Sequence, residues 1–319
     1  MPQLNCTQCS NNSMRSLQGL SGSTVAACGA NHSVGKSVTM RRNPLIAFIG
    51  MAGALLGGCA TGSLEQAGSL QSYDSLVQSD GLLTRSKLRV DKTSVTRART
   101  VKIVPTAFSV SSTQPSLTPA QRSLVANAID RAMCGGLSER FVVVTPSEPA
   151  DLTVRALVTQ VAPTDVVSAG VSRGASVAKS ILLPGVPVPL PRIPVGMGSI
   201  SLEAEARDAH GKQQAAMVWG RGANAFLTSA RLSEESDAYT LASDFGSDFS
   251  KMLVTGETPF GKAPTFPSFE QIGAQLGGDA KYAACRAFGP SPGLIGLVGG
   301  SVGVPPSWTD KGAVVAVER

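Results

Sequence analysis

The chain has few of the side chains on which enzyme active sites usually depend. Its 319 residues include 2 histidines, 2 tryptophans and 3 tyrosines. His210 is the only histidine after residue 58. A single imidazole offers little for metal binding or for general base catalysis. The sequence therefore predicts no cofactor and no metal site.

Acidic residues are absent from the first 58 positions, which contain four basic ones. Arg41 and Arg42 precede an uncharged apolar run from Leu45 to Leu56, and two glycines connect this run to Cys59. A basic segment, a short apolar segment and a small-residue cleavage site are typical of a secretory signal. Leu56–Cys59 resembles the lipobox of bacterial lipoproteins, which implies cleavage before Cys59 and acylation of its thiol.

Long apolar runs are also absent. The segment 44–58 has 15 residues, which make about 22 Å of helix at ~1.5 Å per residue, against a hydrocarbon core of ~30 Å. Its four glycines would weaken a transmembrane or buried helix. The sequence therefore favours a lipoprotein signal peptide over residues 40–58.

Residues 1–39 are rich in Asn, Ser and Gly and have no helical or strand periodicity. We interpret them as an over-extended reading frame that precedes a true start at Met40; an unusually long basic region of the signal is the alternative. Residues 30–37 fit a relaxed P-loop pattern, but no strand is expected before them and no helix after them. Cys6 and Cys9 form a CxxC motif without a second pair. Neither motif is interpreted as a site.

Removal of the signal lowers the charge of the chain. The whole sequence carries a net charge of +6, whereas the part from Cys59 onward has 24 basic and 22 acidic residues. No nucleic-acid partner is therefore predicted. Besides Cys59, this part contains Cys134 and Cys285, which in an oxidising periplasm favour one disulfide. Two separate buried thiols are the alternative.

Residues 59–100 are predicted to be a tether, with Tyr73 and Leu76 as its first packing contacts. Seven basic residues lie between positions 85 and 102, where Asp91 is the one acidic residue. Such a segment can lie on anionic lipid head groups. It can equally be a solvated linker that leads into an edge strand guarded by charges.

Residues 101–256 are predicted to form one α+β domain. Helices are expected from a capping box at Thr118 to Cys134, and from Ala238 to a stop at Gly256. Strands are expected over residues 101–105, 141–144, 152–162, 200–207 and 214–221, with a hairpin turn at 208–211. This order predicts a mostly antiparallel sheet with two helices on one face.

Two further segments are rich in proline and glycine. Pro163–Gly198 is predicted to be an extended apolar loop inserted in the domain, and residues 257–319 a C-terminal extension. Within the extension, Tyr282–Cys285 is expected to form a short helical turn attached to the first helix through Cys134. The apolar stretches Ile181–Val195 and Leu294–Val304 would be protein or lipid contact surfaces if exposed, and part of the core if buried.

Five segments of the chain together resemble one known family. They are Tyr73-Asp74, Val101–Pro105, Pro149–Ala156, Gly198–Asp208 and Phe245–Leu253. This set resembles the bacterial lipoprotein family known as domain of unknown function 3313, over roughly Tyr73 to Gly256. The resemblance does not extend to the proline-rich insertion or to the C-terminal extension. It implies a lipid-anchored envelope protein and supplies no catalytic residues.

Two GxSxG motifs, centred on Ser172 and Ser301, raise the possibility of a serine hydrolase. No histidine follows Ser301. Asp208 and His210 follow Ser172 in the order that such enzymes require, but both fall in one expected turn.

Glu203 and Glu205 point to the same side of an expected strand, roughly 6.6–7 Å apart, a spacing compatible with paired-carboxylate chemistry. The alternation of polar and apolar residues predicts instead that this side is solvated, and Arg207 continues the charged row.

The sequence thus favours a non-enzymatic, lipid-anchored protein whose α+β domain binds a protein or lipid partner in the envelope. Ala60 replaces the aspartate that retains enterobacterial lipoproteins in the inner membrane, so the periplasmic face of the outer membrane is the expected location. The alternatives are a periplasmic serine hydrolase that uses Ser172, Asp208 and His210, and a purely structural envelope protein.

Overall fold

The computed structural model describes residues 63–110, 117–182, 192–261 and 268–312. The predicted signal peptide and Cys59 lie outside the described residues.

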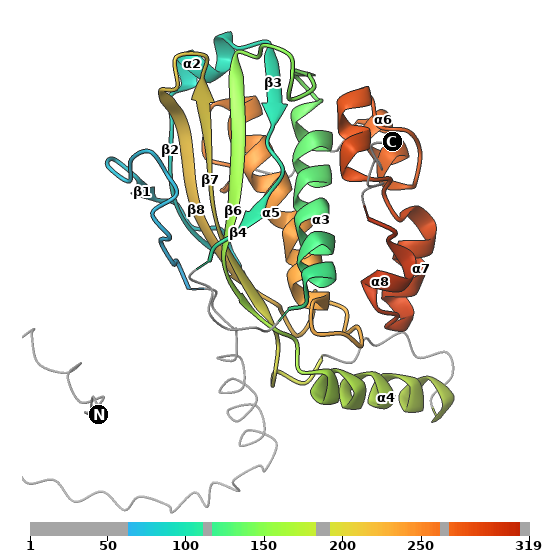
Figure 1. Ribbon diagram of the computed structural model, residues 1–319. Helices are drawn as coiled ribbons and strands as arrows, with labels where there is room; N and C mark the ends of the chain where they lie inside the picture. Colours follow the sequence, from blue (N-terminus) through green and yellow to red (C-terminus); the bar gives the residue numbers. More distant parts are fainter. Residues whose placement is uncertain (1–62, 111–116, 183–191, 262–267, 313–319) are drawn as a thin grey trace, which may run out of the picture. The chain divides into compact units, whose positions relative to one another are not determined.

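The domain is built on an eight-stranded sheet of order β1-β2-β8-β7-β6-β3-β5, with β4 paired to β6 (Figure 1). The pairs β1–β2, β2–β8, β8–β7 and β7–β6 are antiparallel, and the shorter β3, β4 and β5 pair in parallel. The strands are β1 (Val77–Gln78), β2 (Thr84–Val90), β3 (Thr100–Ile103), β4 (Ala107–Phe108), β5 (Val142–Val143), β6 (Leu152–Ala162), β7 (Ser199–Asp208) and β8 (Gln213–Gly222). This confirms the predicted α+β fold with a mostly antiparallel sheet.

Helices α3 (Pro119–Leu137) and α5 (Ser236–Thr255) cover one face of the sheet (Figure 1). The capping box is present, because Thr118 and Gln121 each accept a hydrogen bond from the other's backbone N–H. Helix α3 continues through the glycines expected to end it. A Cβ at Gly136 would lie 2.5 Å from the Ser250 Cβ, so this glycine allows α3 and α5 to approach closely. Helix α5 ends at Gly256, whose φ of 67° is left-handed.

The core lies between these helices and the sheet. Trp219 of β8 meets Phe245 of α5 edge to face at 5.5 Å between ring centroids, and Phe245 stacks on Phe249 at 6.0 Å. The inward side chains of β7, among them Leu202 and Ala204, are buried against the same layer. The burial of these apolar side chains is the main favourable contribution to the free energy of folding.

The prediction that residues 59–100 form a tether is wrong for residues 77–90. Strand β2 pairs with β8 over seven residues, and only the two-residue β1 lies beyond it at the sheet edge. Thr84, Ser86 and Leu88 are buried, while Arg85 and Lys87 are exposed. Residues 84–90 are thus a strand and not a solvated linker, so the alternative of a linker that leads into an edge strand is also wrong for them. A short helix, α2 (Lys92–Arg97), follows, and the Asp91 side chain caps it.

The prediction that the insertion Pro163–Gly198 is an extended loop is wrong for its first half. Helix α4 spans Val166–Leu182. No proline occurs between Thr164 and Leu183, so the backbone there is free to form a helix, and Asp165 accepts a hydrogen bond from the Ser168 N–H at 2.7 Å at its start. The four prolines that motivated the prediction lie at residues 184–191, outside the described residues.

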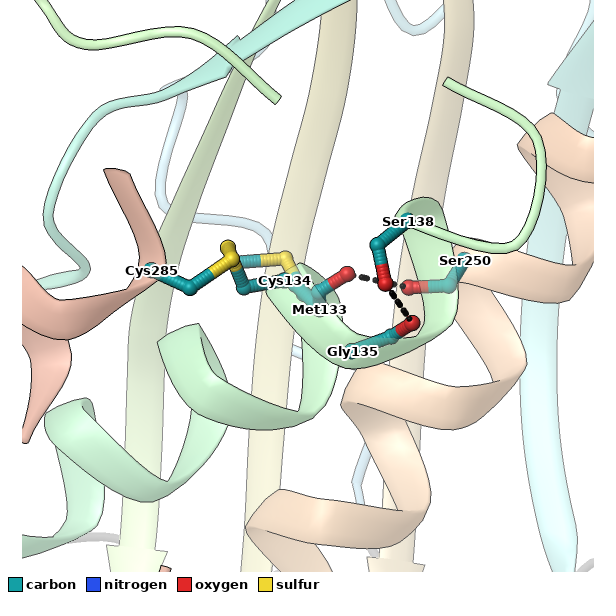
Figure 2. The surroundings of a disulfide bond; sticks show 6 residues. All are labelled: Met133, Cys134, Gly135, Ser138, Ser250 and Cys285. Atoms are coloured by element: carbon teal, nitrogen blue, oxygen red, sulfur yellow. Dashed lines mark hydrogen bonds between the residues drawn. A yellow bond between two sulfur atoms is a disulfide. The ribbon is translucent and has the colours of Figure 1, made fainter. Parts of the chain in front are cut away.

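The C-terminal extension packs beside α3 (Figure 1). A disulfide joins Cys134 of α3 to Cys285, with 5.9 Å between the Cα atoms, inside the usual ~4.4–6.8 Å (Figure 2). Arg131 adds an ion pair with Asp310 and a 3.1 Å hydrogen bond to the Phe288 carbonyl. The extension contains α6 (Phe269–Gln275), the 3₁₀ helix η2 (Ala283–Phe288), α7 (Gly293–Val302) and α8 (Pro306–Thr309). The short helical turn expected at Tyr282–Cys285 corresponds to η2.

Candidate functional site

The carboxylates Glu203 and Glu205 are not solvated, contrary to the prediction from strand alternation. Their exposed fractions are 0% and 2%, although they do lie on the sheet face opposite α3 and α5. Residues 64–76 cover them, and Leu70 packs there against Ala216 and Val218. The alternation identified the face correctly, but it carried no sign that another segment covers it.

Glu203 binds the N-terminal segment through several hydrogen bonds. It accepts from the Ala67 N–H at 2.9 Å, from the Ser69 N–H at 3.2 Å and from the Tyr73 hydroxyl at 2.7 Å. Burial, reinforced by the bond to Glu203, raises the pKa of Tyr73. The Gln71 N–H donates to Glu205 at 2.9 Å, and Arg207 forms an ion pair with Glu205. Both carboxylates are therefore occupied in holding residues 67–73 on the sheet.

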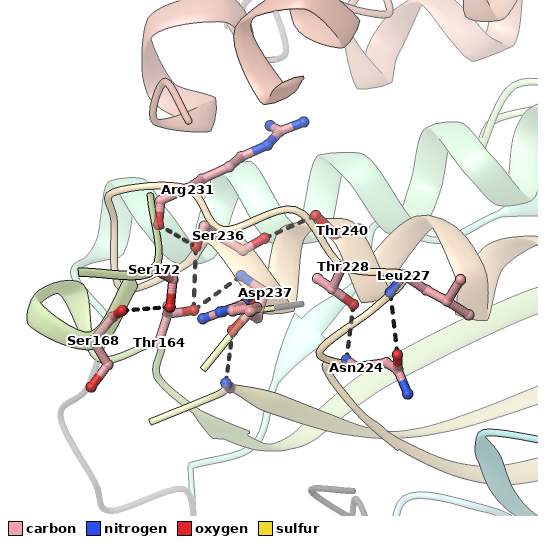
Figure 3. Close-up of polar contacts among 12 residues, drawn as sticks. Thr164, Ser168, Ser172, Asn224, Leu227, Thr228, Arg231, Ser236, Asp237 and Thr240 are labelled. Carbon is pink, nitrogen blue, oxygen red and sulfur yellow. Dashed lines mark hydrogen bonds and ion pairs between the residues drawn. The ribbon is translucent and has the colours of Figure 1, made fainter. Parts of the chain in front are cut away.

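The structure does not bring the proposed serine triad together. Ser172 is buried within α4, and its hydroxyl donates to the Ser168 carbonyl at 2.8 Å (Figure 3). The same hydroxyl accepts from the Ile193 N–H at 3.1 Å. His210 is exposed in the turn after β7, where its N–H donates to Asp208. Ser172 lies beside the start of β7 and His210 beyond its end, and a ten-residue strand spans roughly 30 Å.

Ser301 lies in α7 rather than at a strand-to-helix turn, and its hydroxyl donates to the Val298 carbonyl at 2.7 Å. Neither GxSxG motif therefore forms a nucleophile elbow.

A cavity of about 740 Å³ lies between helices α3 and α5 and the C-terminal extension. Much of its wall is alanine, glycine, proline and leucine, which leaves room and an apolar surface. Its charged lining residues are Arg131, Arg231, Lys281, Arg286, Glu139 and Asp279. Cations thus outnumber anions in a space large enough for a small ligand.

Arg231 is the most distinctive of these side chains. It is half-buried, its guanidinium lies 5.8 Å from the centre of the Tyr239 ring, and burial lowers its pKa. A Cβ at Gly300 would come within 2.1 Å of its terminal nitrogen, so α7 has no side chain where Arg231 rests. Among the described residues, no carboxylate pairs with it. Figure 3 shows it reaching from the loop before α5 toward the C-terminal helices.

The neighbouring Arg131 has its charge balanced. Its guanidinium pairs with Asp310, which also accepts a hydrogen bond from the Tyr239 hydroxyl at 2.7 Å. Burial raises the pKa of Tyr239, as does the Asp310 carboxylate. The network therefore fixes the Tyr239 ring, on which Arg231 rests, while the charge of Arg231 stays available to a bound anion.

Sequence reasoning missed this cavity. Arg231 falls in a segment without helical or strand periodicity, and the residues of the extension that line the opposite wall lie 37 or more positions farther along the chain. No local pattern around Arg231 indicates that the two segments meet.

Two apolar surfaces are exposed. In the stretch Leu294–Val304, five large apolar side chains are exposed on α7 and are not part of the core: Leu294, Ile295, Leu297, Val298 and Val302. A second group lies on α4 and the loops beside it. In the part of the chain that the structure describes, no helix has both the length and the hydropathy to cross a bilayer, and no cluster of His, Cys, Asp and Glu is arranged to bind a metal.

Comparisons with known proteins gave one family and a set of distant solved structures, two of which follow. A solved structure titled "PelC dodecamer from Paraburkholderia phytofirmans" has 10% sequence identity and a TM-score of 0.34, and the match covers 54% of this chain and 98% of that one. A substituted form of the PelC dodecamer from the same organism has 15% identity and a TM-score of 0.27, with 53% and 92% covered. No curated protein matched.

The family model described as "Protein of unknown function (DUF3313)" matches residues 65–249. This range takes in the segment over Glu203, strand β2 and most of α5, so it agrees with a domain that begins well before residue 101. The match covers more than half of the chain. The chain therefore belongs to the DUF3313 family of proteins of unknown function.

Proposed function

We propose that this protein is a lipoprotein of the bacterial outer membrane that faces the periplasm and acts by binding a ligand rather than by catalysis. The anchor is acylated Cys59, with palmitate as one of its chains, in accordance with the signal pattern of residues 40–58. The binding role depends on one observation: a half-buried arginine, Arg231, which has no acidic partner among the described residues and lines a largely apolar cavity.

The chemistry of the cavity indicates the class of ligand. A guanidinium that has lost part of its hydration is stabilised when a carboxylate or phosphate takes the place of water. Arg231 is in that position, and its planar fork suits either anion. The alanine, proline and leucine wall beside it suits an apolar body. The proposed ligand is therefore an amphiphile with an anionic head.

The two alternative functions have less support. A serine hydrolase needs its nucleophile and base within hydrogen-bond reach, and Ser172 and His210 lie beside opposite ends of β7. A purely structural role would give the cavity no ligand, an outcome that the following experiment distinguishes.

The binding test uses a dansyl-labelled fatty acid as the probe and the mature, full-length protein. We expect Arg231→Gln to weaken binding by on the order of tenfold, because a hydrogen bond to a charged group contributes about 1.5–3 kcal/mol. Arg155→Gln, at an exposed position on β6, is the matched control and should bind like the unsubstituted protein. Equal affinity for all three proteins would place the probe elsewhere, and no binding by any of them would favour the structural role.

The anchor has its own test. Intact-mass measurement of membrane-extracted protein should give a chain that begins at Cys59 and carries acyl groups, whereas Cys59→Ser should remain unacylated and uncut by the lipoprotein peptidase. A free Cys59 thiol, together with a retained segment 40–58, would contradict the proposal.

A further inference from the structure

The described chain begins at one end of the sheet. The Ser63 hydroxyl donates to the Gln160 side chain, and the Ser201 hydroxyl donates to the Ser63 carbonyl. Gln160 and Ser201 are register partners, two positions from Ala162 and Ser199, where β6 ends and β7 begins. Ser63 is therefore fixed against the end of the sheet that leads into α4.

Only four residue steps separate Ser63 from Cys59. Fully extended chain covers at most ~3.3–3.6 Å per residue, so these steps reach roughly 14 Å. If Cys59 is acylated, as the proposed function requires, Ser63 cannot lie farther than this from the lipid head groups. The anchor is thus too short to act as a long tether, and the α4 end of the domain must lie close to the bilayer.

The segments at this end are joined into one surface. The Arg192 N–H donates to the Ala225 carbonyl at 2.7 Å, and the Thr164 N–H donates to the Glu234 carbonyl at 2.9 Å. These bonds connect the start of α4, the residues before β7 and the loop after β8. Figure 1 places α4 at the same end of the sheet, beyond the last residues of β6.

This end carries large apolar side chains that face solvent. Exposed fractions are 76% for Val167, 68% for Phe226 and 71% for Leu227, and Val171 and Val195 are also more than half exposed. We call these five residues the apolar end. Single exposed apolar residues are common, but a group of this kind marks an interaction surface.

The loop that carries Phe226 and Leu227 is held in shape by polar contacts. The Asn224 side chain accepts from the Leu227 N–H at 3.2 Å, and the Thr228 hydroxyl accepts from the Asn224 N–H at 3.0 Å (Figure 3). The Asn224 side chain also accepts from the Phe226 N–H at 2.8 Å. The two side chains are therefore presented outward by a preformed turn, which reduces the entropy lost on contact.

The opposite end of the sheet carries one large exposed apolar side chain among the described residues of its strands and of the β7–β8 turn, Val142 of β5, which is 46% exposed. The β7–β8 turn consists of Asp208, Ala209, His210, Gly211 and Lys212, and its tip is exposed and polar. Of the two ends of the sheet, the end to which the short anchor leads thus carries the larger group of exposed apolar side chains.

We propose that the apolar end contacts the lipid bilayer and holds the domain in a fixed orientation on the membrane surface. The inference rests on the proposed function, because the position of the bilayer follows from acylation of Cys59. The occupant is the lipid surface itself, with Phe226 and Leu227 reaching the boundary between head groups and acyl chains.

The test places an environment-sensitive NBD label at a single cysteine in the acylated, full-length protein. Cys134 and Cys285 are bonded to each other and Cys59 is acylated, so a new cysteine is the free thiol among these positions. Phe226→Cys and Val167→Cys probe two elements of the apolar end, and His210→Cys is the control. Proteins are reconstituted in vesicles of phosphatidylethanolamine and phosphatidylglycerol, with and without spin-labelled lipid, and the mass of each sample is measured.

We expect the labels at positions 226 and 167 to brighten several-fold and to be quenched by spin-labelled lipid, while the label at position 210 behaves as in water. Solvent-like labels at both apolar positions in a protein of acylated mass would overturn the inference and leave the anchor intact. Brightening without quenching would also overturn it, since a second copy or another protein would then cover this end. A mass without acyl chains would overturn both the inference and the proposed anchor.

Discussion

The two faces of the sheet are buried by different kinds of contact. On the face toward α3 and α5, aromatic and aliphatic side chains pack around Trp219 and Phe245. On the other face, Glu203 and Glu205 hold residues 67–73 through backbone N–H groups and hydroxyls. Alternate residues of β7 thus take part in two unlike arrangements.

The two faces show which kinds of burial can be recognised in a sequence. Apolar packing needs apolar residues on both partners, so it leaves a periodic pattern on β7, β8 and α5 alike. A carboxylate that accepts hydrogen bonds from backbone N–H groups needs no particular residue opposite it, since almost every residue supplies such a donor. The covering segment therefore looks like an ordinary polar linker.

The largest effect is expected from the apolar face. Phe245→Ala should lower the free energy of unfolding by about 3–5 kcal/mol, because it removes a buried ring and leaves a cavity against Trp219. Chemical denaturation followed by circular dichroism measures this. The control, Phe226→Ala, removes an exposed ring and should change stability little. Equal losses in both variants would show that burial does not distinguish the two rings.

A substitution on the face of Glu203 and Glu205 should loosen only the segment that these carboxylates hold. Glu203→Ala is expected to cost about 2–3 kcal/mol, because it removes charge-assisted bonds to the Ala67 and Ser69 N–H groups and to Tyr73. Hydrogen exchange should speed up for residues 67–71 and stay slow in β7 and β8.

The same measurement on Glu139→Ala, a carboxylate on the other side of the domain, should leave residues 67–71 protected. A cooperative loss of protection throughout the sheet in Glu203→Ala would contradict the division between the two faces.

A smaller effect concerns one carboxylate on the apolar side. Asp248 accepts a hydrogen bond from the Trp219 indole at 2.9 Å, and burial raises its pKa to about 6. Because the folded protein binds this proton more tightly than the unfolded chain does, the contribution to stability is present below about pH 4 and is lost as the pH rises through about 6.

We expect Asp248→Asn to remove this contribution while keeping an acceptor for Trp219. Relative to the unsubstituted protein, the variant should gain on the order of 2 kcal/mol between pH 4 and pH 7. Denaturation at the two pH values provides the measurement. Parallel stability curves for the two proteins would contradict a raised pKa at this site.

The features that could be predicted from the sequence alone are local. The capping box at Thr118, the turn at Asp208–Gly211 and the stop at Gly256 each depend on residues a few positions apart, and the structure has all three. The alternation of apolar and polar residues in β6 and β7 and the apolar stripe of α5 also predicted these elements, because each element packs one side against the same apolar core.

The contacts between distant segments could be learned only from the folded protein. Strand β2 was not predicted, because its charged residues resemble those of a linker and its partner β8 lies about 130 positions away. Helix α4 was not predicted, because the prolines beyond residue 183 suggested an extended segment. The pairing of Cys134 with Cys285, the cover over Glu203 and the cavity around Arg231 all need segments far apart in the chain to be brought together. Local preferences carry no information about such contacts, because the free energy that selects them comes from the packed whole.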